Sequence, residues 1–260
     1  MELRGKNVVI TGASSGIGRA TALEMARRGA NVVLAARRAN RLEQVAAECR
    51  ALGVNAITVP TDVANAAECR RLIDTAGEVD VLVNNAGFAI FSSIPDANAN
   101  EARAMIETNY LGAFHCTQAV LPRMLARRSG TIVNISSITG LMGFARMSAY
   151  CASKFALTGF TEGLRDEVIG SGVHVALVCP GTTDTEFFVK AERGKMPGAS
   201  RLMLAVKPER VARAVCDAAE DGRYRRILPI LAATYMRMKE VFPRLAHLLF
   251  RKVSALMERR

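Results

Sequence analysis

Residues 7–18 read NVVITGASSGIG, an apolar run that ends at Thr11 and a glycine-rich turn that leads directly into a helical pattern. Glycines permit a tight turn here and let the backbone approach a pyrophosphate closely. The start of the following helix offers free amides and a positive dipole end to phosphates. The spacing is G-x-x-x-G-x-G rather than the more common G-x-G-x-x-G, but the order strand, turn, helix is typical of a dinucleotide-binding loop. We therefore predict a cofactor-binding turn made of Gly12, Ser14, Ser15, Gly16, Ile17 and Gly18.

The remainder of the chain repeats this alternation of short apolar runs and longer amphipathic stretches. The predicted strands are Asn7–Thr11, Asn31–Ala36, Asn55–Val59, Val79–Asn84, Thr131–Ser136 and Val173–Cys179, with a short one near Arg226–Leu228. The predicted helices are Ile17–Arg28, Asn40–Leu52, Ala64–Ala76, Glu101–Arg127 and Ser148–Gly170, with another that begins near Pro208. Strands that are apolar on both faces belong to a parallel sheet with helices on each side. The sequence thus predicts an α/β fold, a Rossmann-type doubly wound parallel sheet in three layers.

Length and composition fit this architecture. A chain of 260 residues suits one large domain better than two small ones, and half of the residues are hydrophobic. We expect no signal peptide and no spanning helix, because Met1–Lys6 leads straight into the first strand and no run of about 18 apolar residues exists. The six cysteines are scattered and do not cluster with the three histidines. This favours reduced thiols in a cytoplasmic protein without a metal site.

The end of the second strand indicates which dinucleotide binds. An acidic residue there would hold the ribose 2′-hydroxyl of NAD, whereas arginine accommodates the 2′-phosphate of NADP. The sequence has Arg37 and Arg38 after Ala36 and no acid. NADP(H) is therefore favoured over NAD(H), although both arginines could instead begin a solvated loop.

Two further segments follow predicted strands and would reach the same edge of the sheet. Asp62 and Val63, after the third strand, are placed to meet an adenine ring. Asn85, Ala86 and Gly87 follow the fourth strand, and ligands of open α/β sheets bind along this edge. Either segment alone could equally be a simple turn.

Tyr150 and Lys154 form the candidate acid/base pair. Residues four apart lie on one helical face, so the ammonium group can sit close to the phenol. A nearby cation lowers a phenol pKa, and a shift of about three units from ~10 requires about 4 kcal/mol. The pair is thus suited to proton transfer near neutral pH.

In combination, the motifs resemble those of the short-chain dehydrogenases/reductases, over about residues 5 to 230. The matching features, in the order and spacing of that family, are TGxxxGIG at 11–18, Asp62, NNAG at 84–87, Asn109, Ser137, Tyr150-x-x-x-Lys154 and Pro180-Gly181. Ser136 competes for the serine role, but the spacing of thirteen residues to Tyr150 selects Ser137.

The resemblance implies a role for each matching residue. Tyr150 would exchange the proton with the substrate oxygen while hydride moves to or from the nicotinamide. Lys154 would hold the nicotinamide ribose and lower the pKa of Tyr150, and Ser137 would hydrogen-bond the substrate oxygen. Asn109 would lie at an irregularity of its helix and hold a water chain. The loop around the nicotinamide carboxamide would contain Pro180, Gly181, Thr183 and Thr185, with Thr182 between them.

The variable segments indicate a hydrophobic substrate. Apolar side chains recur at 88–94, 140–148 and in the expected lid, residues 182–204; they are Phe88, Ile90, Phe91, Leu141, Met142, Phe144, Met147, Phe187, Phe188 and Met203. Such a lining suits an apolar ketone or secondary alcohol, for example a 3-oxoacyl, steroid-like or other lipid-like compound. Each of these side chains could instead belong to the core. Basic lid residues at Lys190, Arg193, Lys195 and Arg201 could face an acyl-carrier partner but are read as solvated charges.

The chain end differs in character from the rest. We assign residues 1–231 to the dinucleotide-binding catalytic domain and residues 232–260 to a basic amphipathic helical tail. From Tyr235 to Arg260 seven basic residues stand against two acids, within a net charge of +11 for the chain. A helix that opens at Pro243 could lie on an anionic membrane, pack on its own domain, cover the pocket or join subunits. Nucleic acid is disfavoured, because interleaved aromatics and a reading motif are absent.

The sequence therefore predicts an NADP(H)-dependent oxidoreductase that assembles as a homodimer or homotetramer, with peripheral membrane contact through the tail left open. The alternative is a dinucleotide-sensing or membrane-surface interaction protein that uses the same fold without turnover.

Overall fold

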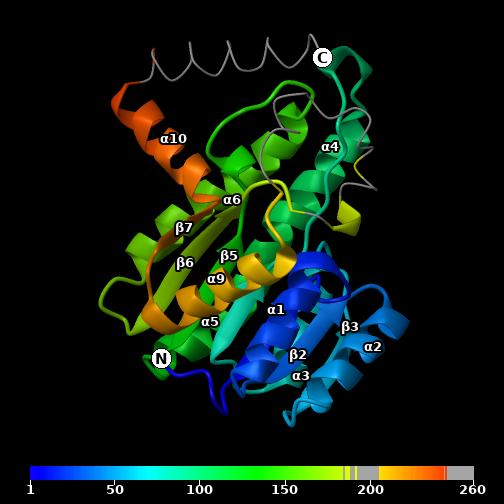
Figure 1. Cartoon of the computed structure of the whole chain (residues 1–260). Helices are drawn as coiled ribbons and strands as arrows, with labels where there is room; N and C mark the ends of the chain where they lie inside the picture. The colour runs from blue at the N-terminus through cyan, green and yellow to red at the C-terminus, as the bar shows by residue number, and fades with distance from the viewer. Residues whose placement is uncertain (184, 188–190, 192–204, 243, 245–260) are drawn as a thin grey trace.

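The computed structural model describes residues 1–183, 185–187, 191, 205–242 and 244 (Figure 1). Seven strands form one sheet in the order β3-β2-β1-β4-β5-β6-β7, and all neighbours pair in parallel. The strands are β1 Asn7–Thr11, β2 Asn31–Ala36, β3 Ala56–Pro60, β4 Val81–Asn84, β5 Gly130–Ile135, β6 Val173–Pro180 and β7 Arg225–Leu228. The strand order reverses direction between β1 and β4, as it does in a doubly wound sheet. The predicted fold is confirmed.

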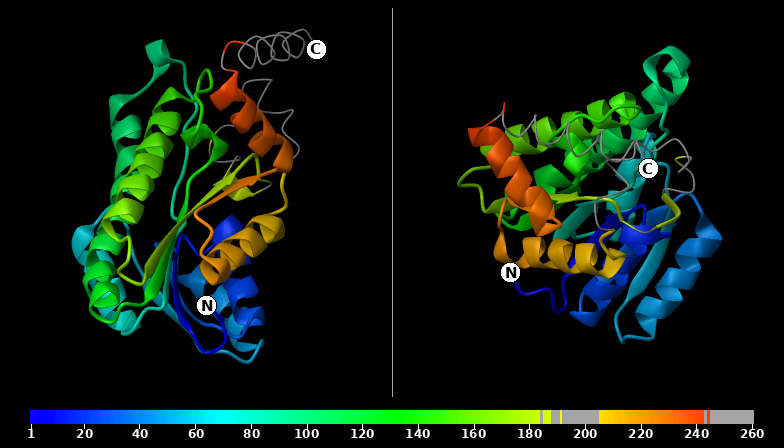
Figure 2. Two further views of the ribbon diagram at one scale, coloured as in Figure 1. Left: turned by 90° about the vertical axis from the view of Figure 1, so that its left-hand side faces the viewer. Right: turned by 45° about the horizontal axis from the view of Figure 1, so that its top comes forward.

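Helices cover both faces of the sheet (Figure 2). One face is packed by α1 Gly16–Arg27, α2 Ala39–Arg50 and α9 Pro208–Asp221. The other is packed by α3 Ala66–Ala76, α5 Gly112–Ala126 and α6 Ser148–Glu167. The result is the expected three-layer arrangement.

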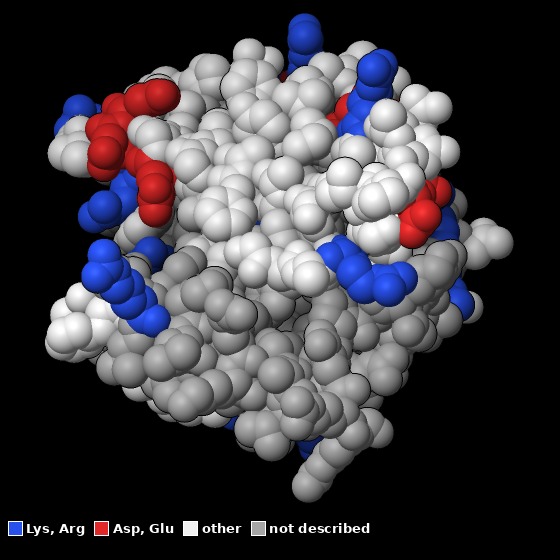
Figure 3. Space-filling view, turned by 90° about the horizontal axis from the view of Figure 1, so that it is seen from above, with Lys and Arg blue, Asp and Glu red and all other residues white. Residues whose placement is uncertain are grey.

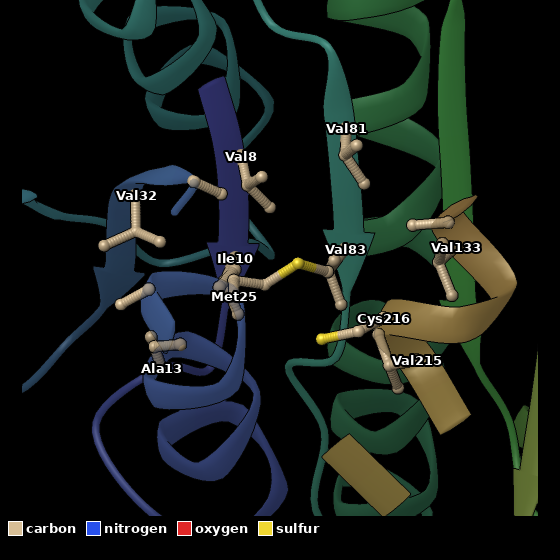
Figure 4. Packing of buried hydrophobic residues seen from close by; sticks show 14 of the residues in the cluster. Val8, Ile10, Ala13, Met25, Val32, Val81, Val83, Val133, Val215 and Cys216 are labelled. Carbon is tan, nitrogen blue, oxygen red and sulfur yellow. The ribbon is translucent and has the colours of Figure 1, made fainter. Parts of the chain in front are cut away.

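Aliphatic side chains fill both layers between sheet and helices. Successive strand residues point to opposite faces, so Ile10 packs toward α1 while Val9 packs toward α3 and α5. Figure 4 shows the first layer, where Met25 of α1 and Cys216 of α9 meet Ile10 and Val83. All four of these side chains are fully buried. Burial on both faces explains the uninterrupted apolar runs of the sequence.

The long helix predicted over Glu101–Arg127 is divided in the structure. It consists of α4 Ala99–Ile106, a π-helical segment η2 Glu107–Leu111, and α5. A π turn widens the helix by one residue and often occurs at functional sites. The predicted helix is therefore present, together with the irregularity that the family resemblance implied at Asn109. Two short 3₁₀ turns, η1 Ile94–Asp96 and η3 Ile138–Gly140, lie outside the main elements.

The chain after β6 is described only in part. Thr183 bridges to Val206 in parallel, and after α9 and β7 the helix α10 Ile230–Val241 leads away from the sheet (Figure 1). The predicted boundary between residues 231 and 232 falls in the first turn of α10. Lid residues 184, 188–190 and 192–204, with Phe188, Lys190, Arg193, Lys195, Arg201 and Met203, lie outside the described residues, as do tail residues 243 and 245–260. No helix in the described part of the chain has the length and hydropathy needed to cross a bilayer.

Candidate active site

A cleft of about 710 Å³ runs along the carboxyl ends of the strands. The strand order places Arg37, Arg38 and Asp62, which follow β2 and β3, toward one end of its lining, and Ser137, which follows β5, toward the other with Tyr150. Nearly all predicted site residues line it: Gly12, Ser14, Ser15, Gly16, Ile17, Arg37, Arg38, Asp62, Val63, Asn85, Ala86, Gly87, Ser137, Tyr150, Lys154, Pro180, Gly181, Thr183 and Thr185. Two predicted residues, Gly18 and Asn109, are not part of the lining. The cleft has the size of a small-molecule site.

The glycine-rich turn lies close to the segment after β4. Gly12 has a φ of +66°, and a Cβ atom there would lie 2.8 Å from the Cα atom of Ala86. Gly18 stands behind the cleft wall, where a Cβ atom would come within 2.3 Å of the Gly12 carbonyl oxygen. Gly18 therefore lets α1 approach the turn closely and forms no part of the wall itself.

The segment Asn85–Gly87 is tied to the end of β1. The Thr11 hydroxyl accepts hydrogen bonds from the backbone amides of Asn85 and Ala86, at 3.0 and 3.1 Å. The Asn85 side chain donates to the Thr11 carbonyl oxygen at 2.9 Å. These bonds hold the segment against the glycine-rich turn and keep both at the rim of the cleft.

The arginines at the end of β2 have different surroundings. Arg38 donates to the hydroxyls of Ser14 and Ser15, at 3.0 and 2.8 Å, and to Glu186 at 3.2 Å. The side chain of Arg37 is 75% exposed, and its ion pair with Asp62 is long at 3.9 Å. Arg37 is thus the more accessible guanidinium, while Arg38 is already engaged within the protein.

Ser137, Tyr150 and Lys154 come together where β5, β6 and α6 meet. Lys154 Nζ donates to the carbonyl oxygen of Ile135, the last residue of β5, at 2.9 Å. Ser137 Oγ donates to the Pro180 carbonyl oxygen at 3.3 Å, and its hydroxyl interacts with the Tyr150 phenol. All three side chains are more than nine-tenths buried. The sheet thereby places two hydroxyls and an amine on one wall of the cleft.

The expected lowering of the Tyr150 pKa by Lys154 is not found in the protein alone. Burial raises the pKa of Tyr150 well above its usual value, and the Ser137 hydroxyl offsets this only in part. Burial also lowers the pKa of Lys154, from 10.5 to about 8. The physical reason is common to both groups, because a low-dielectric site disfavours the charged form of each. Desolvation of the buried phenol thus outweighs the effect of the neighbouring amine.

Asn109 lies outside the cleft lining and contacts the cleft wall through Phe88. It is fully buried in η2, and its side-chain amide donates to the Phe88 carbonyl oxygen and to Ser153 Oγ, both at 2.9 Å. Its side-chain oxygen accepts from the Phe88 amide at 2.9 Å. Ser153 in turn donates to the Tyr150 carbonyl oxygen at 2.7 Å. Asn109 therefore links the Phe88 segment of the wall to the first turns of α6.

Apolar side chains surround the Tyr150 end of the cleft. Of the predicted substrate contacts, the wall includes Phe88, Ile90, Phe144, Met147 and Phe187. Phe91, Leu141 and Met142 do not line the cleft and pack in the adjoining core cluster, to which Phe144 and Met147 also belong. The Tyr150 ring lies 5.7 Å from that of Phe187, centroid to centroid. On the described part of the face seen from above, uncharged side chains form a broad central area and most charged ones lie toward the outline (Figure 3).

Comparison with known proteins identifies the family. A family model described as short chain dehydrogenase matches residues 6–195. The chain belongs to the short-chain dehydrogenase family. It is accordingly an oxidoreductase that binds a nicotinamide dinucleotide.

Relatives of this dehydrogenase include enzymes with different names. Ketoacyl reductase HetN of Nostoc sp. is 37% identical over 84% of this chain and 77% of its own length. The 11-beta-hydroxysteroid dehydrogenase 1A of Arabidopsis thaliana is 45% identical over 71% of this chain, which spans about half (54%) of that protein. A solved short chain dehydrogenase/reductase from Burkholderia phymatum, in complex with NAD, has a TM-score of 0.85 and 30% identity, with 94% of this chain and 96% of that chain covered.

The cleft lining also contains residues that were not predicted as site residues, among them Thr108, Thr139 and Glu186. Thr139 lies two residues after Ser137, and its buried hydroxyl, beside the Tyr150 phenol, acts to lower the pKa of Tyr150. Thr108 belongs to η2, and Glu186 follows Thr185. In the sequence, Thr139 and Glu186 could have been predicted as site residues only because they lie close to Ser137 and Thr185. Among the residues with described positions, no three or more His, Cys, Asp or Glu side chains are grouped as metal ligands.

Proposed function

We propose that this dehydrogenase transfers hydride between NADP(H) and a hydrophobic ketone or secondary alcohol, with Tyr150 as the general acid/base. One observation carries the proposal: Ser137, Tyr150 and Lys154 share a wall of a cleft whose far end holds Arg37 and Arg38. A hydride-transfer enzyme requires its proton donor beside the nicotinamide, at the end of the cofactor cleft that lies opposite the ribose 2′-phosphate.

The residues would divide the chemistry as follows. Bound NADP(H) would supply hydride to the carbonyl carbon or accept it from the alcohol. Tyr150 Oη would give its proton to the carbonyl oxygen in reduction and take it back in oxidation. Ser137 Oγ would donate a hydrogen bond to the same oxygen and stabilise its developing charge. Lys154 would hold the nicotinamide ribose.

The raised pKa of Tyr150 makes the charge of Lys154 important. A phenol with a high pKa is a weak acid, so proton transfer needs a cation near the phenolate as it forms. In a buried site the attraction between such charges is stronger than in water. Asn109 would assist by fixing the wall at Phe88; a water chain from Asn109, which the family resemblance implies, stays a prediction.

The substrate class is supported by the wall around Tyr150. Phe144, Met147 and Phe187 present apolar surface beside the phenol. The names of the relatives, a ketoacyl reductase and a hydroxysteroid dehydrogenase, agree with a 3-oxoacyl, steroid-like or other lipid-like carbonyl compound.

The proposed reaction is tested by following cofactor absorbance with a panel of apolar ketones and aldehydes. Tyr150→Phe removes only the phenol oxygen, so we expect turnover to fall by about 10²-fold or more, since general acid catalysis contributes 10²–10⁴-fold. NADPH binding, measured by fluorescence titration, should be retained. Tyr235→Phe, at a tyrosine outside the cleft lining, is the matched control. NADPH binding without oxidation across the whole panel would instead favour a dinucleotide-sensing protein.

The preference for NADP(H) is supported by two guanidiniums and no acid at the end of β2, whereas the solved relative holds NAD. Arg37→Asp should repel a 2′-phosphate and accept a bond from a 2′-hydroxyl. We expect the NADPH/NADH ratio of kcat/KM to fall by about tenfold or more, equivalent to ~1.4 kcal/mol or more. Arg27→Asp makes the same charge change on α1, outside the cleft lining, and should leave the ratio unchanged. An unchanged ratio in Arg37→Asp would reject the assignment.

Assembly and surface contacts are part of the same proposal. Exposed apolar side chains on α5 and α6, Leu125 and Phe155, support a homodimer or homotetramer, which light scattering would test. Contact of the tail with an anionic membrane is supported by its charge and by exposed Ile230 and Leu231 at the start of α10. Sedimentation with anionic vesicles, with and without residues 232–260, would test it.

A further inference from the structure

The Arg38 side chain is hydrogen-bonded to other residues of the protein at the cofactor end of the cleft. Its guanidinium makes four hydrogen bonds, two to Ser14 and one each to Ser15 and Glu186. A guanidinium has five N–H groups, so most of its donor capacity is used inside the protein. Ser14 and Ser15 belong to the phosphate-binding turn, and Arg38 follows β2. Glu186 comes from a segment 148 residues further along the chain.

Glu186 is held by two cations at once. Its Oε2 atom accepts from Arg38 at 3.2 Å, and its Oε1 atom accepts from Arg41 of α2 at 3.0 Å. The hydrogen bond from Arg38 is the main cause of a lowered pKa for Glu186. The carboxylate is therefore charged at neutral pH. Glu186 and Arg38 both line the cleft, beside Arg37.

A carboxylate on this guanidinium resembles the ligand that the site is proposed to bind. Carboxylates and phosphates pair with arginine through the same N–H groups. A 2′-phosphate that reaches Arg38 must therefore displace the Glu186 carboxylate or share its donors. Arg37, three-quarters exposed with one long ion pair, has no comparable engagement among the described residues.

We infer that Glu186 competes with the cofactor's 2′-phosphate for Arg38 and so limits the preference of this enzyme for NADP(H) over NAD(H). This rests on the proposed function, because it assumes that the 2′-phosphate binds at Arg37 and Arg38. Glu186 is then a specificity-determining residue supplied by the segment after β6, in addition to the residues at the end of β2.

The test compares 2′,5′-ADP (adenosine 2′,5′-bisphosphate) and 5′-AMP, two cofactor fragments that differ only in the 2′-phosphate. Their dissociation constants are measured by calorimetry for the wild type and for Glu186→Gln. Since two partly exposed ion pairs are released, 2′,5′-ADP should bind about threefold to tenfold more tightly to the variant. Binding of 5′-AMP should change by less than about twofold on the same grounds.

The control is Glu43→Gln, which makes the same charge change on α2. Glu43 pairs with Arg50 at 2.6 Å, is more exposed than Glu186 and does not line the cleft. Neither dissociation constant should change in this variant. An equal gain for both fragments in Glu186→Gln would indicate a general charge effect and overturn the inference, as would weaker binding of 2′,5′-ADP.

The two proposals fail in different ways. If the wild type prefers 2′,5′-ADP and Glu186→Gln does not strengthen that preference, the competition by Glu186 is refuted while the NADP(H) assignment stands. If the wild type shows no preference but Glu186→Gln gains one, the NADP(H) assignment fails and the competition stands. If neither protein shows a preference, both are refuted.

Discussion

Ser136 and Ser137 are adjacent at the end of β5, but their hydroxyls have different partners. Ser136 Oγ contacts the Lys154 carbonyl oxygen at 3.2 Å and Thr158 Oγ1 at 3.0 Å, so it fastens β5 to α6. Ser137 Oγ contacts the Pro180 carbonyl oxygen and the phenol of Tyr150. Successive residues of an extended segment point in opposite directions, which separates the two roles. The structure thus gives a reason for the choice of Ser137 that spacing alone had suggested.

Alanine substitution of each serine should separate turnover from stability. Ser137→Ala should lower kcat by about 10²-fold, in the range for removal of one donor to a developing oxyanion. Its unfolding free energy should change little. Ser136→Ala should lower the unfolding free energy by about 1–2 kcal/mol through lost buried hydrogen bonds. Its kcat should remain near that of the wild type, and steady-state kinetics with urea unfolding measure both quantities. The reverse pattern would assign the catalytic hydroxyl to Ser136.

The residue types of the site were accessible from the sequence, but their partners were not. Local order sufficed for the glycine-rich turn and for the pair Tyr150 and Lys154. Arg38 donates a hydrogen bond to Glu186, which lies 148 residues further along the chain. No sequence pattern near Arg38 predicts that partner. Whether the pKa of Tyr150 is raised or lowered depends on burial by elements that are distant in the sequence. The spacing of four residues between Tyr150 and Lys154 gives no information about that burial.

At the scale of elements, η2 explains how a helix interruption positions the site. The π turn carries Asn109 at its centre, and the three hydrogen bonds of this side chain hold Phe88 and Ser153. Phe88 opens the apolar segment after β4, and Ser153 lies in the same turns of α6 as Tyr150. The periodicity of the sequence could not show this interruption, because the apolar pattern continues on both sides of it. The strands, in contrast, were predicted to within one or two residues, since their limits coincide with turns and charged residues.

Asn109→Ala should loosen this connection. It leaves the part-buried amide and carbonyl of Phe88 and the buried Ser153 hydroxyl without their partner, so we expect a loss of about 2–4 kcal/mol in unfolding free energy. The KM for apolar carbonyl compounds should rise, because the wall at Phe88 is no longer fixed. Asn98→Ala is the control, since Asn98 caps the other end of α4 through the Asn100 amide and does not line the cleft. It should cost about 1 kcal/mol and leave KM unchanged. A normal KM in a folded Asn109→Ala protein would contradict the positioning role.

At the scale of the whole molecule, the site imposes a cost on folding. Lys154 is a cation buried between sheet and helix, and the hydrogen bond to Ile135 is the only one recorded for its amine among the described residues. Enzymes commonly retain such groups because function requires them, at the expense of stability. The two cores on either side of the sheet supply the apolar burial that makes this tolerable.

The free-energy penalty of burying the Lys154 cation should decrease as the pH rises. The pKa of Lys154 is about 8 in the folded protein, against 10.5 ordinarily. Between these values the unfolded chain holds the proton and the native protein has lost it, so the free energy of unfolding rises with pH in this window. Below pH 8 both states are protonated and the penalty of the buried charge is fully present, at roughly 3 kcal/mol.

Lys154→Met removes the charge and keeps an unbranched side chain. Below pH 8 the variant should be more stable than the wild type by about 2 kcal/mol, after allowance for the lost bond to the Ile135 carbonyl oxygen. That advantage should shrink between pH 8 and 10.5 and vanish or reverse above it, while turnover is abolished at every pH. Urea unfolding across this range measures the difference between the two proteins, in which the titration of the shared tyrosines and cysteines largely cancels. Lys207→Met, at an exposed lysine before α9, should show no such trend. A variant that is less stable than the wild type by a constant amount at all pH values would mean that Lys154 stabilises the fold and that its burial carries no charge penalty.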